Sequence, residues 1–258
     1  MPKFAANLTM LFNESPFLER FEQAKLAGFD AVEYLFPYNW EAKVLAERLK
    51  KHELKQVLFN LPPGDWESGE RGIACHPTRV EEFKQGIDQA IYYAETLGVK
   101  QLNCLSGLQS DIPAEIAQET LLTNLSYAAD QLAQHQLTLL VEPINSRVDM
   151  PGFFLDTLDK ALNCLHTLNK PNLKVQFDLY HMQIMQGDLI RSLEKHLPDI
   201  AHIQFADNPG RHEPGTGEIN FSNVFRRLDE IGYSGYVSAE YLPKSQTVAG
   251  LGWLQTFN

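Results

Sequence analysis

The stretch LTLLVEPIN, residues 137–145, is an apolar run that ends in a single acid. Its residues 137–141 predict a strand buried on both faces, as the strands of parallel sheets are. Glu142 follows directly, and Pro143 ends the strand. A carboxylate at the edge of a core is unfavourable unless a proton, a cation or hydrogen bonds replace its lost hydration. The stretch therefore predicts a buried parallel strand and a partner for Glu142.

The same unit, a short apolar run followed by an amphipathic segment, recurs from one end of the chain to the other. Apolar runs predict strands at 3–8, 29–35, 54–60, 99–105, 137–142, 173–178, 200–207 and 235–241. Helical periodicity predicts helices at 16–28, 40–53, 78–97, 113–135, 156–168, within 186–197, and at 221–232.

Apolar strands that alternate with helices indicate an α/β fold whose parallel sheet is covered by helices. Eight such units in 258 residues most economically close into a (β/α)8 TIM barrel, and no linker divides residues 1–258, so we expect a single domain. An open, doubly wound sheet is the alternative. Its usual dinucleotide signature, GxGxxG after the first strand, is missing, since residues 7–15 read NLTMLFNES.

Composition narrows the class of protein further. The chain has 22 basic and 33 acidic residues and a formal net charge of −11, which argues against a nucleic-acid partner. No apolar run reaches the roughly 18 residues of a membrane span, and the N-terminal apolar patch is too short for a signal peptide. Three cysteines without a CxxC predict free thiols. The expected location is therefore the cytoplasm. Whether the chain forms a homo-oligomer stays open.

Polar residues mark the C-terminal ends of four successive predicted strands. These are Glu142, Asp178, Gln204 and Glu240, each about one strand–helix unit after the previous one. In a barrel these strand ends converge on the mouth where active sites are built. The four side chains are therefore predicted to lie together at the mouth.

Three converging carboxylates repel one another. One pair about 4 Å apart costs about 4 kcal/mol at an effective dielectric constant of about 20. A cation would relieve this repulsion, and three carboxylates with one amide oxygen suit a hard divalent ion such as Mg²⁺ or Mn²⁺. Zinc would more often recruit histidine or cysteine ligands. We therefore expect a divalent metal ion bound by Glu142, Asp178, Gln204 and Glu240.

Other residues near the predicted mouth could bind a substrate. His181, three residues after Asp178, could donate a hydrogen bond to substrate oxygens. Arg71 and Arg211 lie in predicted loops and could grip a carboxylate with two parallel hydrogen bonds, and His212 adjoins Arg211. His202 would share a strand face with Gln204, as a buried supporting residue.

The sequence resembles the hydroxypyruvate isomerase family, within the xylose-isomerase-like barrel superfamily. The resemblance covers nearly the whole chain. It rests on the motifs FAANLTMLF at 4–12, VEYLFPY at 32–38, NLPPGDWESGERGIAC at 60–75, VEPIN at 141–145, QFDLYHMQ at 176–183, HIQFADNPGRHEPGTGEIN at 202–220 and AEYLPK at 239–244.

This resemblance implies an isomerase of a small hydroxy or oxo acid. It implies that Glu142 and Glu240 are the proton donor and acceptor, and that Glu142, Asp178, Gln204 and Glu240 bind the divalent metal. The metal would stabilise the enediolate between hydroxypyruvate and tartronate semialdehyde. Related 2-oxo-tetronate isomerases act on a four-carbon acid and remain the alternative, although the GERGIAC and EPIN motifs look more like the hydroxypyruvate branch.

Two readings from other classes compete with an isomerase. A metal-dependent hydrolase, like the related apurinic endonucleases, would need more histidine ligands and a surface that grips DNA, whereas this chain is acidic. A non-catalytic binding barrel would gain nothing from converging acids, since apolar residues would serve a purely structural role better.

Overall fold

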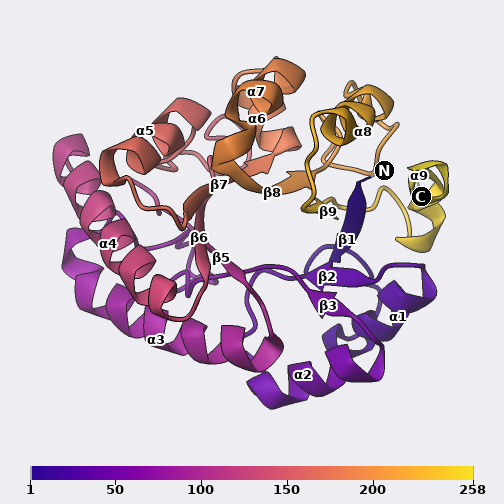
Figure 1. Ribbon diagram of the computed structural model, residues 1–258, viewed down its shortest axis with the longest axis horizontal. Coiled ribbons are helices and arrows are strands. Elements are labelled where there is room, and N and C mark those ends of the chain that lie inside the picture. The colour runs from indigo at the N-terminus through magenta and orange to yellow at the C-terminus, as the bar shows by residue number, and fades with distance from the viewer. Residues whose placement is uncertain (1, 258) are drawn as a thin grey trace.

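The computed structural model describes residues 2–257. Its strands are all parallel and lie in the order β3-β2-β1-β9-β8-β7-β6-β5-β4. Viewed end on, they curl into a ring with the helices outside (Figure 1). The strands are β1 (Lys3–Asn7), β2 (Ala31–Glu33), β3 (Lys55–Gln56), β4 (Phe59–Asn60), β5 (Gln101–Cys104), β6 (Thr138–Val141), β7 (Leu173–Asp178), β8 (Ile200–Phe205) and β9 (Tyr236–Ala239).

The segments β3 and β4 are two pieces of the strand predicted at 54–60. β3 pairs with β2, and β4 pairs with β5. Between them the chain stays close to the second strand, because Val57 N donates to Val32 O and Asn60 N donates to Leu35 O, both at 2.9 Å. These bonds link the two ends of the sheet order, so the ring is closed and holds eight strands when β3 and β4 are counted as one. The predicted (β/α)8 barrel is confirmed, and the interruption of its third strand is a correction.

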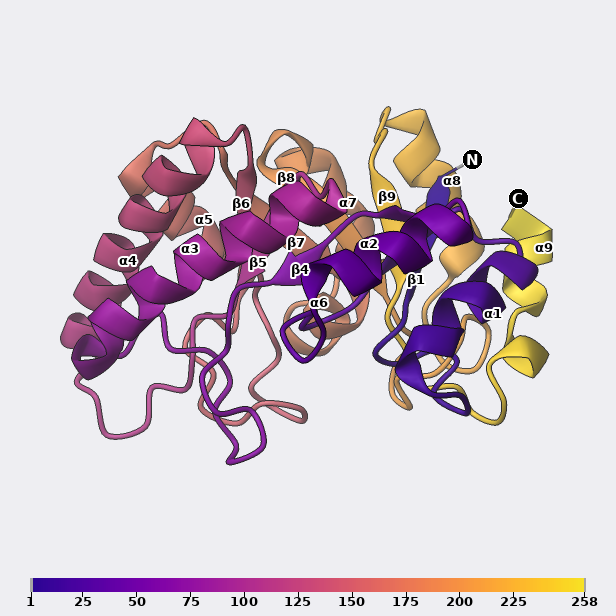
Figure 2. The ribbon, with the colours of Figure 1, turned by 90° about the horizontal axis from the view of Figure 1, so that it is seen from below.

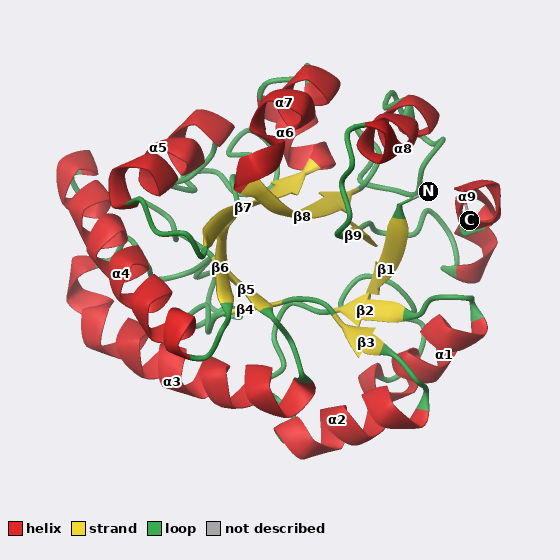
Figure 3. Ribbon diagram, in the orientation of Figure 1, coloured by secondary structure: helices red, strands yellow, loops and turns green. Residues whose placement is uncertain are grey.

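Helices cover the outer face of the ring (Figure 3). They are α1 (Arg20–Leu26), α2 (Ala42–Lys51), α3 (Val80–Leu97), α4 (Ala114–Gln134), α5 (Leu158–Leu168), α6 (Leu179–Met185), α7 (Leu189–His196), α8 (Phe221–Glu230) and α9 (Gly252–Phe257), with short 3₁₀ turns at Phe17–Glu19, Pro77–Arg79, Leu197–Asp199 and Val248–Gly250. The sequence did not predict α6 or α9. It placed the start of the first helix at residue 16, where the structure has a 3₁₀ turn before α1.

The apolar core has two parts. The larger part fills the layer between strands and helices, and each helix contributes its apolar face to it. The smaller part lies inside the barrel and consists of Ala5, Ala31, Val57, Leu58 and Leu140. Aliphatic side chains thus fill one end of the barrel, and polar side chains occupy the rest of its interior, as the next section describes.

The long loops gather on one side of the barrel, at the lower edge of Figure 2. This is the side of the C-terminal strand ends. One loop, residues 61–76, packs against the end of β5 through Gly72, which has a φ of +104°. A Cβ atom at this position would lie 2.3 Å from Leu105 O, so only glycine allows the close approach.

Two expectations about the whole chain can be compared with the described residues. None of the helices within residues 2–257 is long and apolar enough to cross a membrane. Cys75, Cys104 and Cys164 are all free, as their number and spacing predict, and the structure buries all three.

Candidate active site

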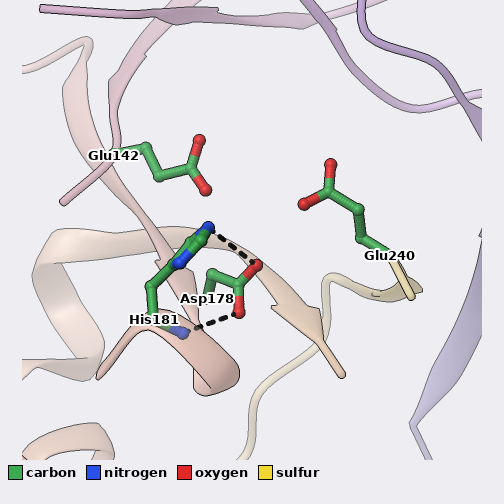
Figure 4. Close-up of side chains that lie close together, drawn as sticks. All are labelled: Glu142, Asp178, His181 and Glu240. Carbon is green, nitrogen blue, oxygen red and sulfur yellow. Dashed lines mark hydrogen bonds and ion pairs between the residues drawn. The ribbon is translucent and has the colours of Figure 1, made fainter. Parts of the chain in front are cut away.

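Four buried side chains meet at the C-terminal end of the barrel. Glu142, Asp178, His181 and Glu240 each offer one ligand atom, and these atoms lie within 4.8 Å of one another. Each of the four residues is at most 4% exposed. Figure 4 shows the carboxylates of Glu142 and Glu240 directed toward each other, with Asp178 and His181 beside them. We call this group the carboxylate cluster.

The barrel itself brings the cluster together. Glu142 directly follows β6, Asp178 is the last residue of β7, and Glu240 directly follows β9. Asp178 also caps α6, because its Oδ1 accepts hydrogen bonds from Tyr180 N at 2.7 Å and His181 N at 3.3 Å. The cap starts a helix without any intervening loop, and its first turn carries His181 into the cluster.

Burial and mutual repulsion make this cluster an unfavourable place for three negative charges. Burial, and then the charges of Glu240 and Asp178, raise the pKa of Glu142 well above its ordinary value. Burial, opposed by the charge of Arg211, raises the pKa of Asp178 to about 6 and that of Glu240 to about 8. The chain alone therefore does not supply enough positive charge to keep the three acids ionised.

The donor set fits a divalent cation. Asp178 Oδ2 is buried and has no hydrogen-bond partner among the described residues. Glu142 Oε2 accepts a hydrogen bond from Asn103 Nδ2 at 2.9 Å. A buried acid oxygen without a donor is unfavourable, and a metal ion shared by three carboxylates would satisfy it. The cluster could thus hold a metal ion, with Glu142, Asp178 and Glu240 as its oxygen donors.

Hydrogen bonds fix the orientation of His181. Asn145 Oδ1 accepts from Val148 N and Asp149 N at 3.0 Å each, so its amide nitrogen faces the opposite way. That nitrogen donates to His181 Nδ1 at 2.7 Å, which leaves the ring proton on Nε2. Burial also lowers the pKa of His181 well below its ordinary value, which favours the neutral ring. The Nε2–H group lies 3.9 Å from Asp178 Oδ2, so His181 presents a donor to the cluster.

Arg211 lies against the cluster. Its Nη2 donates to Glu240 Oε2 and its Nη1 donates to Asp149 Oδ1, both at 3.1 Å. Its guanidinium lies 5.2 Å from the centre of the Tyr180 ring. The Nε atom of Arg211 is buried and has no partner among the described residues. Arg211 therefore links two loops of the mouth and keeps one donor unused.

Gln204 lies beside Glu240, but its side-chain amide is not oriented as the predicted role of an oxygen ligand for the metal ion requires. Its Nε2 donates to Glu240 Oε1 at 3.2 Å and to Glu33 Oε1 at 2.6 Å. Its Oε1 accepts from Gln176 Nε2 at 2.5 Å. The amide nitrogen, and not the oxygen, thus faces Glu240, and an oxygen ligand from Gln204 would require the amide to turn over.

Arg71 makes its contacts away from the carboxylate cluster. Its Nη1 donates to the backbone oxygens of Trp66 and Glu70, at 3.1 and 2.7 Å, and its guanidinium lies 4.2 Å from the Trp66 ring centre. It lines a cavity of about 220 Å³ with His76 and Leu108. His212 also points away from the cluster, since its Nδ1 contacts Leu242 O at 2.7 Å.

Sequence reasoning missed several polar residues of the mouth. Asn7 and Glu33 are the last residues of β1 and β2, so the strand-end rule used for the later strands would have found them. Asn103 in β5 could have been found in the same way. Asn145 and Asp149 lie in the loop after β6, and no simple pattern singles them out.

Comparison with known proteins agrees with this geometry. The model of the xylose isomerase-like TIM barrel family matches residues 21–257. The hydroxypyruvate isomerase of Escherichia coli is 46% identical over 258 residues, which cover 100% of both chains. The 2-oxo-tetronate isomerase of Cupriavidus necator is 45% identical over 261 residues, which cover 100% of this chain and 99% of the other.

Solved structures show the same barrel. A crystal structure described as AP endonuclease, family 2, from Brucella melitensis is 48% identical, has a TM-score of 0.98 and matches over 100% of both chains. The 3-keto-D-glucoside 4-epimerase of Escherichia coli is 19% identical with a TM-score of 0.83, covers 99% of this chain and 100% of its own, and shares the fold. The chain therefore belongs to the hydroxypyruvate isomerase family of xylose isomerase-like TIM barrels.

Proposed function

We propose that the protein is a sugar-acid isomerase that interconverts hydroxypyruvate and tartronate semialdehyde. The observation that carries this proposal is the carboxylate cluster, in which two glutamates from separate strands face one buried point beside an aspartate and a neutral histidine. The names of two relatives, hydroxypyruvate isomerase and 2-oxo-tetronate isomerase, support the same reaction class.

The carboxylates of Glu142, Asp178 and Glu240 would hold a divalent ion, Mg²⁺ or Mn²⁺, with Gln204 as a fourth ligand if its amide turns over. The bound ion would supply positive charge to the substrate oxygens as an enediolate forms. It would also lower the pKa of the glutamates and keep them ionised as bases at neutral pH. The partnerless Asp178 Oδ2 supports the presence of such an ion.

The reaction needs two proton-transfer groups. Converting hydroxypyruvate into tartronate semialdehyde removes a proton from C3 and adds one to C2, while O3 loses its proton and O2 gains one. Glu142 and Glu240 approach from opposite sides of the cluster, so one can take the C3 proton and return it to O2, while the other takes the O3 proton and delivers it to C2. His181 would donate a hydrogen bond from Nε2 to a substrate oxygen that gains charge.

Two arginines are candidates for the substrate carboxylate. Arg211 borders the cluster and has an unused Nε donor, which suits a carboxylate bound next to the reacting carbons. Arg71 lies over Trp66 beside a small cavity in another loop. We propose that Arg211 binds the acid and that Arg71 adds attraction at the edge of the mouth.

A second substrate has specific support, because the 2-oxo-tetronate isomerase is almost as similar to this chain as the hydroxypyruvate isomerase. The deciding experiment is a side-by-side assay of purified, Mn²⁺-loaded protein with hydroxypyruvate and with 2-oxo-tetronate. A higher kcat/KM for hydroxypyruvate supports the proposal, and a higher value for the four-carbon acid replaces it with the second candidate. If the protein converts neither acid, the proposed isomerase activity is wrong.

The endonuclease name of the Brucella structure raises a rival activity, which the charge of this chain disfavours. The net charge is −11, and three acids occupy the barrel mouth, so a DNA backbone would be repelled. The same assay should include a duplex with an abasic site, which we expect to stay intact.

The buried free cysteines support the cytoplasm as the location of this enzyme.

A further inference from the structure

Glu33 is a buried acid of the mouth that the proposed reaction does not use. It ends β2 and is 1% exposed. Its Oε1 accepts hydrogen bonds from Asn7 Nδ2 at 3.0 Å and from Gln204 Nε2 at 2.6 Å. Its Oε2 contacts His202 Nε2 at 2.7 Å. Such a fully bonded carboxylate inside a barrel calls for a specific role, because burying it is costly.

The same two amides also hold Glu240. Asn7 Nδ2 donates to Glu240 Oε1 at 3.0 Å, and Gln204 Nε2 donates to the same oxygen at 3.2 Å. Each amide thus uses one N–H for Glu33 and the other for Glu240. Two parallel bridges therefore connect Oε1 of Glu33 to Oε1 of Glu240, while Oε2 of Glu240 faces Arg211.

Glu33 is itself anchored from the opposite side. The amide nitrogen of Gln101 faces His202 Nδ1 at 3.2 Å, so Nδ1 is the acceptor and the ring proton lies on Nε2. That proton points at Glu33 Oε2. The series Gln101, His202, Glu33 and the two amides runs from inside the barrel to Glu240, and every bond in it has a defined donor and acceptor.

We propose that Glu33 is a positioning residue for Glu240. It directs the N–H groups of Asn7 and Gln204 onto Oε1 of Glu240, which fixes the carboxylate plane and leaves Oε2 to accept from Arg211. The inference rests on the proposed role of Glu240 in proton transfer. The Asn7 bridge does not depend on how the Gln204 amide is turned, so it tests the idea independently of any ligand role of Gln204.

The test is Glu33→Gln, which keeps the shape of the side chain but removes a charge and one acceptor. We expect kcat to fall at least about tenfold, with KM and the Mn²⁺ dissociation constant changed by less than about threefold. The matched control is Tyr34→Phe, at the residue next to Glu33. It removes a buried hydroxyl that donates to Gln56, from a ring that packs against Phe17 and Phe21. It should lower the melting temperature and leave kcat unchanged.

Two further measurements keep the proposal falsifiable. Asn7→Ala deletes one bridge but leaves the Glu33–His202 contact, so it should reproduce the loss of kcat even if Glu33→Gln fails to fold. In the double variant Asn7→Ala, Glu33→Gln, the two losses of kcat should not add. A crystal structure of either variant should show the Glu240 carboxylate rotated in an unchanged barrel. Unchanged kcat in both variants, or an unmoved Glu240, would overturn the positioning role. If the wild-type protein is inactive on both acids, the proposed function is wrong. The orientation of the Glu240 carboxylate in the variant structures would still test the positioning role of Glu33.

Discussion

Glu142 and Glu240 come from the non-adjacent strands β6 and β9 and direct their carboxylates toward one buried point. Asn103 bonds Glu142, and Asn7 together with Arg211 bonds Glu240. The two glutamates thus have different hydrogen-bond environments, and this asymmetry allows them to play different parts in a proton transfer.

The first prediction concerns Glu240→Gln, which keeps the size of the side chain and removes its basicity. We expect kcat to fall by about 10²–10⁴-fold, the range of general acid–base catalysis, with a cooperative melting transition retained. Glu115→Gln, an acid in the exposed first turn of α4, is the matched control and should keep full activity. Turnover of Glu240→Gln near the wild-type rate would remove Glu240 from the chemistry.

The second prediction concerns metal removal. EDTA-treated protein should be inactive and should regain activity with Mg²⁺ or Mn²⁺. Because the ion binds only the folded chain, Mn²⁺ at about 100 times its dissociation constant should add about 2.7 kcal/mol to the free energy of unfolding. Asp178→Asn should abolish this stabilisation in a thermal melt. Equal melting temperatures with and without Mn²⁺ in the wild type would contradict the metal site.

The third prediction follows from the raised pKa values of the cluster. In metal-free protein, Asp178 and Glu240, with pKa values of about 6 and about 8, keep protons that the unfolded chain has already lost above its ordinary pKa values near 4. The folded state then binds more protons than the unfolded state, so the cluster's contribution to stability falls as pH rises from about 4 to about 8.

Urea denaturation at pH 5, 6, 7 and 8 measures this dependence. Metal-free wild type should lose stability across the series more steeply than metal-free Glu240→Gln, which lacks one titrating acid. Saturating Mn²⁺ should flatten the wild-type slope, because the ion favours the ionised carboxylates. Parallel slopes for all three samples would show that the cluster does not titrate in this range.

The fold was predictable because its main signal is local. Eight apolar runs with intervening amphipathic segments identify the strands and the outer helices, and closure follows from their number. The missed elements depend on tertiary contacts. Helix α6 begins without a loop because Asp178, fixed by β7, caps it, and the third strand is interrupted where Val57 and Leu58 enter the barrel core.

The candidate site was only partly predictable, for a similar reason. The strand-end rule located Glu142, Asp178 and Glu240, because position along a strand decides which end a side chain occupies. It could not give the orientation of the Gln204 amide, which depends on Gln176 and Glu33 from other strands. The orientation of a side chain in a polar network depends on the hydrogen bonds of all the residues in that network, so a local sequence pattern does not predict it.

The last prediction concerns Arg71, whose contacts lie in its own loop and whose guanidinium covers the Trp66 ring. If it attracts an acid substrate at the edge of the mouth, Arg71→Ala should raise KM by about three- to tenfold and change kcat by less than twofold, because the lost attraction acts on binding and not on proton transfer. Arg191→Ala, which removes an exposed arginine of α7, is the control and should leave both constants unchanged. An unaltered KM in Arg71→Ala would restrict this arginine to packing on Trp66, and carboxylate recognition would then rest on Arg211 alone.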